Sequence, residues 1–167
     1  MKLLCVLAVA AAATIPDGSW LLSYGGKPIA TAVNDKRMLP VVRNRLPVAL
    51  VGRVFGSLGD ARTPVAVAEG RFVAMTGCGG PDCRLRALLW IDAKGTSALG
   101  AAYEVSAENE RLTIGSNGLS ANDLPPAAMA SLVAWLRANG LDPDVVEFMG
   151  PSNVPRRVDA EPFRASS

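Results

Sequence analysis

Residues 65–116 constrain the fold more than any other part of the chain. The first part of this segment is rich in β-branched and aromatic residues and is interrupted by a Glu-Gly pair, which predicts a hairpin within it. Residues 85–105 contain two more strand-like runs around an Asp-Ala-Lys-Gly turn signal, and a shorter run follows at residues 111–116. The sequence therefore predicts a meander of about five antiparallel strands.

Helical patterns lie on both sides of this meander. Residues 125–139 begin with two prolines, which a first helical turn tolerates, and then carry apolar residues at a 3.6-residue period up to Gly140. Residues 33–56 are also apolar, but Pro40 and Pro47 interrupt them, so a short or broken helical segment is expected there. We predict an α+β fold in which the C-terminal helix and the shorter N-terminal helical segment pack on one face of the sheet.

The first 13 residues, MKLLCVLAVAAAA, have the pattern of an export signal. A positive charge at Lys2 precedes an apolar stretch that ends in small residues near Ala13, as a signal peptidase requires. The alternative is an N-terminal core helix, but such a helix would carry a polar face, and this segment has none. Cys5 lies at the front of the apolar stretch rather than behind it, so an exported, unlipidated mature protein is expected.

The rest of the chain fits one globular domain. Its 167 residues are half hydrophobic and 19% charged, which argues against both a membrane span and a disordered chain. We predict the domain at residues 14–149 and a flexible tail, rich in Pro, Arg and Ser, at residues 150–167. Loss of Lys2 with the signal leaves 16 Lys and Arg against 15 Asp and Glu, and this near-neutral balance argues against nucleic acid as a partner.

Two cysteines, Cys78 and Cys83, remain in the mature chain and flank the sequence Gly-Gly-Pro-Asp. In an oxidising compartment, this pair predicts a disulfide that closes the tip of the central hairpin. The bridge would hold the loop in one shape for binding a partner, although it stabilises the whole fold by only about 2 kcal/mol. Two alternatives stay open: a disulfide that only closes a hairpin, and a redox or metal site, for which the spacing and the number of ligands fit poorly.

No familiar catalytic arrangement is available to this chain. It contains no histidine, so Ser-His and Cys-His pairs are excluded, and both mature cysteines are expected to be oxidised. The glycines near Cys78 are not followed by Lys and Ser or Thr at the spacing of a phosphate-binding loop. We therefore expect a protein that is not an enzyme and has no cofactor or metal ion.

The order of these features resembles the inhibitor of vertebrate lysozyme (Ivy) family. The resembling stretch spans residues 46–136: a Leu-Pro pair, the hairpin, AMTGCGGPDC, a strand with RALLW, a turn, a strand with ALGAAY, and a helix that begins with proline. Family members carry a Cys-Lys-Pro-His-Asp-Cys loop at this place. The cysteine spacing, Asp82 before the second cysteine, and Trp90 in the following apolar strand match that pattern.

The resemblance implies a periplasmic α+β protein, often a homodimer, that inhibits chicken-type lysozyme by entering its cleft. In the family, the loop histidine bonds to the two catalytic carboxylates, the acid and the carboxylate that flank the bond to be cut. A loop that a disulfide already holds in one conformation loses little conformational entropy when it places the histidine in the cleft. The implied site is therefore the loop of residues 79–82, with Cys78 and Cys83 at its base.

This chain departs from the family pattern at the tip of the loop. Gly79, Gly80 and Pro81 stand at the positions of Lys, Pro and His, and only Asp82 is kept. Proline has no N–H and no polar side-chain atom, so it cannot bond to the carboxylates. We expect a periplasmic inhibitor of a lysozyme or lytic transglycosylase that acts weakly on chicken-type lysozyme. The alternative is a non-inhibitory periplasmic binding or structural module on the same scaffold.

Overall fold

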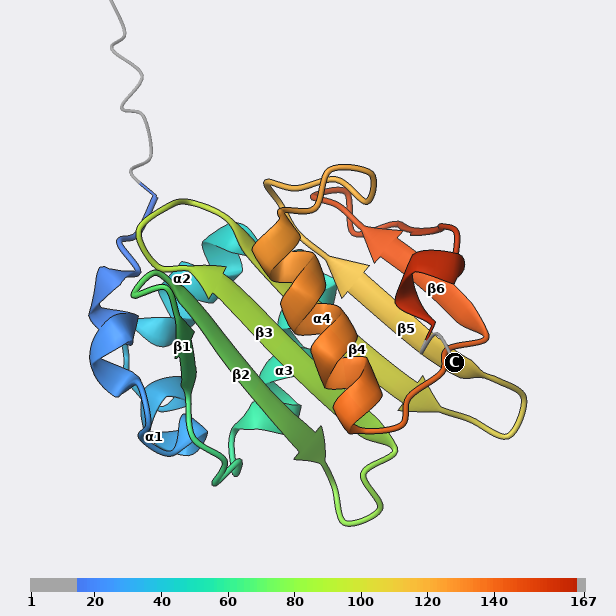
Figure 1. Ribbon diagram of the computed structural model, residues 1–167, viewed down its shortest axis with the longest axis horizontal. Helices are drawn as coiled ribbons and strands as arrows, with labels where there is room; N and C mark the ends of the chain where they lie inside the picture. The colour runs from blue at the N-terminus through green and yellow to red at the C-terminus, as the bar shows by residue number, and fades with distance from the viewer. Residues whose placement is uncertain (1–14, 165–167) are drawn as a thin grey trace, which may run out of the picture.

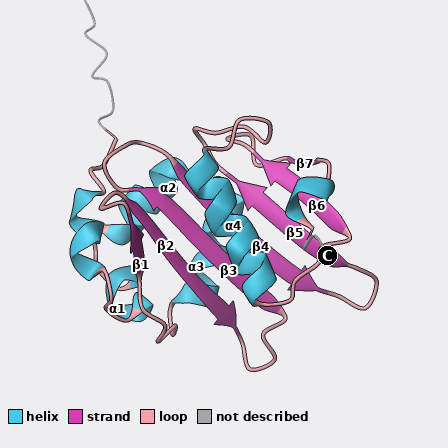
Figure 2. Cartoon of the chain, in the orientation of Figure 1, coloured by secondary structure: helices cyan, strands magenta, loops and turns pink. Residues whose placement is uncertain are grey.

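One sheet of seven strands organises the molecule (Figures 1 and 2). The computed structural model describes residues 15–164, so the export signal predicted at residues 1–13 lies outside the described residues. The strands lie side by side in chain order: β1 (Ala66–Ala68), β2 (Phe72–Gly79), β3 (Leu85–Asp92), β4 (Ala98–Val105), β5 (Glu110–Gly115), β6 (Val145–Met149) and β7 (Pro155–Arg157). All neighbours are antiparallel except β5 and β6, which are parallel. The predicted α+β class is confirmed, while the predicted count of about five strands is too low.

Helices cover both faces of this sheet. One face carries a 3₁₀ segment η1 (Ser19–Tyr24) and the helices α1 (Ile29–Val33), α2 (Met38–Arg45) and α3 (Val48–Leu58). The other face carries α4 (Pro126–Ala138) and the 3₁₀ segment η2 (Glu161–Phe163). Figure 1 shows α4 in front of the sheet and α2 and α3 behind it.

The prediction that the N-terminal and C-terminal helices share one face is therefore wrong. The reason lies in β3, where Leu89 and Ile91 point to the core under α3 while Leu88 and Trp90 point to the core under α4. A strand that is apolar on both faces must be covered on both faces. Each helical layer buries one of the two sets of apolar side chains.

The prolines of the N-terminal segment act in two different ways. Pro40 lies in the first turn of α2, where a missing N–H breaks no intrahelical bond. Pro47 follows the last turn of α2 and serves as the N-cap residue of α3. The predicted interruption is thus found at Pro47 and not at Pro40.

The C-terminal part of the chain adds structure that was not predicted. The chain passes from β5 to β6 by way of α4, and β6 then pairs with β5 in parallel. The last strand, β7, pairs with β6 in antiparallel fashion. Residues 150–167, predicted as a flexible tail, include β7 and η2. Phe163 is 3% exposed in the core beneath α4, so one apolar side chain anchors this segment.

Candidate functional site

The cysteine loop forms the tip of the β2–β3 hairpin, as predicted. A disulfide joins Cys78 to Cys83, with their Cα atoms 5.1 Å apart. Gly80, Pro81 and Asp82 are exposed, and Figure 1 shows the β2–β3 connection projecting beyond the ends of the strands. Gly79 is the last residue of β2 and is only partly exposed. The protruding tip therefore consists of three residues rather than the four that were predicted.

The backbone of the tip is a tight turn. The Cys83 N–H donates to the Gly80 carbonyl over 3.5 Å, which places Pro81 and Asp82 at the two central positions. Gly80 has a φ of +75°, a conformation that proline cannot adopt. Since the Ivy pattern has proline at this position, the loop backbone here differs from one that a Cys-Lys-Pro-His-Asp-Cys sequence can form.

The end of the β2–β3 hairpin that carries the cysteine loop packs against α3. Gly77 and Gly79 both face Ser57 in the last turn of that helix, and Ser57 is buried. A Cβ atom on Gly79 would lie 3.1 Å from the Ser57 hydroxyl, which a side-chain rotation can relieve. The contact with α3 and the disulfide both restrict the motion of the loop, so less conformational entropy is lost when a partner binds it.

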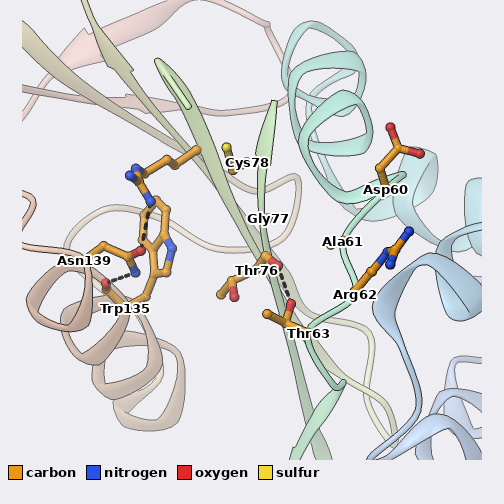
Figure 3. Close-up of a pocket in the computed structure, with 10 residues that line it drawn as sticks. Asp60, Ala61, Arg62, Thr63, Thr76, Gly77, Cys78, Trp135 and Asn139 are labelled. Atoms are coloured by element: carbon orange, nitrogen blue, oxygen red, sulfur yellow. Dashed lines mark hydrogen bonds between the residues drawn. The ribbon is translucent and has the colours of Figure 1, made fainter. Parts of the chain in front are cut away.

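A pocket of about 340 Å³ adjoins the loop along the outer edge of β2 (Figure 3). The segment after α3 forms one wall, the end of α4 with Arg86 of β3 forms the other, and Thr76, Gly77 and Cys78 of β2 form the floor. Figure 3 shows Trp135 and Asn139 on one side of β2 and Asp60 and Arg62 on the other. The disulfide is therefore shared between the protruding loop and this pocket.

Hydrogen bonds hold the side chains of the α4 wall in place. The Asn139 amide group donates to the Trp135 carbonyl over 2.8 Å, and its oxygen accepts from the Arg86 guanidinium over 3.1 Å. On the opposite wall, the Thr63 hydroxyl donates to the Thr76 carbonyl over 3.2 Å. No pattern in the sequence indicates this pocket, because its residues come from four separated segments with no shared motif.

The charged residues at this end of the molecule are mainly basic. Arg62 and Arg86 line the pocket with Asp60, and the exposed Arg84 follows Cys83 directly. Among the described residues, none of these three arginines forms an ion pair. They would attract acidic groups on a partner, with an effect that salt screens.

Displaced pKa values occur away from the loop. Two hydrogen bonds from Arg71 lower the pKa of Asp92, at the opposite end of the β2–β3 hairpin. Burial, assisted by the hydrogen bond to Glu110, raises the pKa of the Tyr103 hydroxyl in β4. Within residues 15–164, no cluster of three His, Cys, Asp or Glu side chains is arranged to hold a metal ion. What the arrangement at the loop offers is a binding surface: a rigid protrusion beside a basic pocket.

Known proteins add no information on this surface. No family model matches the chain, and no curated protein or solved structure matches it either. Of the helices within the described residues, none has both the length and the apolar character needed to cross a membrane.

Proposed function

We propose that the protein is a periplasmic inhibitor of lysozyme-type peptidoglycan-cleaving enzymes and that it inserts its disulfide-closed loop into the enzyme cleft. The observation that carries this proposal is the rigid, exposed tip formed by Gly80, Pro81 and Asp82 between Cys78 and Cys83. A protrusion of this kind fits a concave site and loses little entropy on binding. The resemblance to the Ivy family supplies the class of target.

The loop is not suited to chicken-type lysozyme. Pro81 has no hydrogen-bond donor to offer to a pair of catalytic carboxylates. Inhibition of that enzyme is therefore weak. A lytic transglycosylase, or a lysozyme with a different cleft, is the better target.

A second candidate function is a periplasmic binding or structural module that does not inhibit any enzyme. The positive φ of Gly80 favours this alternative, because it marks a loop backbone that the family sequence cannot adopt. The exposed tip and the retained cysteine pair favour the inhibitor. Homodimer formation, which the resemblance implies, belongs to the same proposal and is measured by sedimentation of the mature protein.

Inhibition assays on a defined panel test the proposal. The mature protein is added to chicken-type lysozyme and to several lytic transglycosylases acting on purified peptidoglycan. Pro81→Glu places a second carboxylate at the loop tip, while Ala107→Glu makes the same charge change at an exposed position between β4 and β5. If the loop enters the cleft, at least one enzyme is inhibited by the wild type and by Ala107→Glu but not by Pro81→Glu.

Two results would contradict the proposal in different ways. Equal inhibition by both variants would mean that another surface makes the contact. No inhibition of any enzyme on the panel would favour the non-inhibitory module.

A further inference from the structure

The outer edge of β2 is only partly covered by its neighbouring strand. β2 pairs with β3 from Phe72 to Gly79, but it pairs with β1 only from Phe72 to Ala74. The chain before β1 turns away instead, and Ile29 and Ala30 donate their N–H groups to the carbonyls of Thr63 and Ala61. Within residues 15–164, the second half of β2 therefore has no strand on its outer side.

The main-chain groups of this open edge point into the pocket. Thr76 accepts a hydrogen bond from the Thr63 hydroxyl through its carbonyl oxygen, so the Thr76 backbone faces outward. In an antiparallel sheet, the N–H and C=O of one residue point to the same side and this side alternates, so the backbone of Cys78 faces outward as well. The Thr63 hydroxyl occupies the position from which the N–H of an added strand would donate to the Thr76 carbonyl. Peptide backbone is the ligand that matches such a row of groups.

The pocket holds one extended segment rather than a second sheet. Walls from the segment after α3 and from the end of α4 stand on either side of the edge (Figure 3). The open stretch from Thr76 to Cys78 is about 10 Å long, which is the length of three residues of a strand. A second copy of the chain would bring its own Arg62 and Arg86 to the same edge, so charge disfavours it as the occupant.

The charges of the pocket select an acidic segment. Two guanidinium groups, those of Arg62 and Arg86, line it together with one carboxylate, that of Asp60. Arg86 is half-buried, and a hydrogen bond to Asn139 holds it in place. Within residues 15–164, its other guanidinium N–H groups have no partner and are left for a ligand. Since Arg86 pairs with Cys78 in the β2–β3 register, an acidic side chain near Cys78 would meet this guanidinium.

We propose that the open edge of β2 binds an extended, acidic segment of a partner protein by strand addition, with Arg86 pairing with its carboxylate. This site is separate from the loop tip and does not require that the protein inhibit an enzyme. The inhibitor proposal and the present one can therefore fail independently.

A labelled peptide tests the site directly. The probe is a fluorescein-labelled pentapeptide, Thr-Val-Glu-Val-Thr, amidated at its C-terminus, and its fluorescence anisotropy is followed as the mature protein is added. Saturable binding is expected, with NMR shifts at the amides of Thr76 and Cys78. Arg86→Gln keeps a donor for Asn139 and should weaken binding about tenfold. Arg84→Gln removes a charge directly before β3, outside the pocket lining, and should weaken binding much less than Arg86→Gln.

Changes in the peptide separate the two parts of the proposal. Replacing its Glu by Lys should weaken binding by at least about tenfold, because the arginines then repel it. Methylating its amide nitrogens at alternate positions should abolish binding, since these N–H groups form the strand ladder.

Several outcomes would overturn the proposal. No rise in anisotropy up to about 1 mM protein would mean that the edge does not accept a strand. Equal binding of the methylated peptide would exclude strand addition. An equal loss of affinity in Arg84→Gln and Arg86→Gln would mean that the peptide responds to the overall positive charge and not to a specific pair with Arg86. A dimer in sedimentation, with the amides of Thr76 and Cys78 protected and no response to peptide, would show that a second copy covers the edge.

Discussion

Gly77 of β2 lies directly against the main chain of Ser57 in the last turn of α3. A Cβ atom on Gly77 would overlap with the Ser57 carbonyl oxygen and would lie 2.9 Å from its carbonyl carbon. Both are backbone atoms, so they cannot move unless α3 itself moves. This contact fixes the hairpin that carries the cysteine loop to the helical layer behind the sheet.

Replacing Gly77 by alanine should therefore destabilise the fold. We expect Gly77→Ala to lower the free energy of unfolding by about 1–3 kcal/mol, as overpacking does in other cores. Urea unfolding followed by circular dichroism measures the change. Gly56→Ala is the matched control, because this exposed α3 glycine has no atom within 4 Å of an added Cβ and alanine favours the helix by about 1 kcal/mol. Equal urea midpoints for Gly77→Ala and the wild type would contradict the close contact.

The docking of α4 on the sheet gives a second prediction. Leu132 is fully buried in the core between α4 and the sheet, so Leu132→Ala should lower the free energy of unfolding by about 2–5 kcal/mol. Val133 is half-buried on the same helix, and Val133→Ala should cost less. A change near zero for Leu132→Ala in urea unfolding would mean that this face of α4 is not docked.

The ion pair between Arg71 and Asp92 makes stability depend on pH. Arg71 donates to the carboxylate from Nε and Nη2 over 2.8 and 2.7 Å, and these bonds hold the pKa of Asp92 below its ordinary value of 3.8. The stabilisation is complete above this ordinary value, and it is lost as the pH falls through the lower value of the folded state. At neutral pH, Asp92→Asn should reduce the free energy of unfolding by about 1–3 kcal/mol.

The pH profile distinguishes this effect from a general loss of packing. The difference between the wild type and Asp92→Asn should shrink as the pH falls below 3.8, because protonated aspartic acid resembles asparagine. Unfolding in urea at several acidic pH values measures it. A difference that stays constant throughout this range would exclude the ion pair as its cause.

The disulfide between Cys78 and Cys83 should form in the exported protein. Mass spectrometry after alkylation without reduction should then detect no modified cysteine in the mature chain. The bridge closes a short loop, so Cys78→Ala with Cys83→Ala should lower the free energy of unfolding by only about 2 kcal/mol. Two alkylated cysteines after native export would contradict the pairing.

Local patterns predicted the local parts of the fold. The four hairpin-connected pairs from β1 to β5 follow turn signals in the sequence. The helix α4 ends at Ala138, and Gly140, just beyond its C-cap residue Asn139, has the φ of +61° that suits the end of a helix. The β6 strand pairs in parallel with β5 after a helical crossover, and no turn signal marks such a pairing. The predicted strands therefore end at Ser116, with the meander, and do not include β6 and β7.

The layers and the pocket depend on contacts between distant residues. The continuous apolar runs of β3 and β4 are typical of strands that are buried on both faces, so they indicate two helical layers rather than the one that we predict. The disulfide between Cys78 and Cys83 could be predicted because the two cysteines lie close together in sequence. The neighbouring pocket was not found, because Arg62, Arg86 and Asn139 come together only when α3 and α4 pack on opposite sides of β2.

The inhibition of chicken-type lysozyme tests the central claim, namely that the disulfide-closed loop is the element that binds the enzyme. The double change Gly79→Lys with Pro81→His brings back the two side chains that the Ivy pattern places there. The fold should tolerate both changes. The nearest atom to a Cβ on Gly79 is the movable hydroxyl of Ser57 at 3.1 Å, the Leu85 atoms lie at an ordinary 3.6 Å, and Pro81 is exposed. Gly80 is kept, so its positive φ is not disturbed.

The decisive measurement is the inhibition constant of this double variant beside the wild type and a control with Gly79→Lys and Pro81→Ala. A charge-assisted contact to buried carboxylates contributes about two decades in affinity. The account predicts weak or undetectable inhibition by the wild type and the control, and measurably stronger inhibition by the double variant. Tight inhibition by the wild type, or no inhibition by the double variant with its disulfide intact, would contradict it.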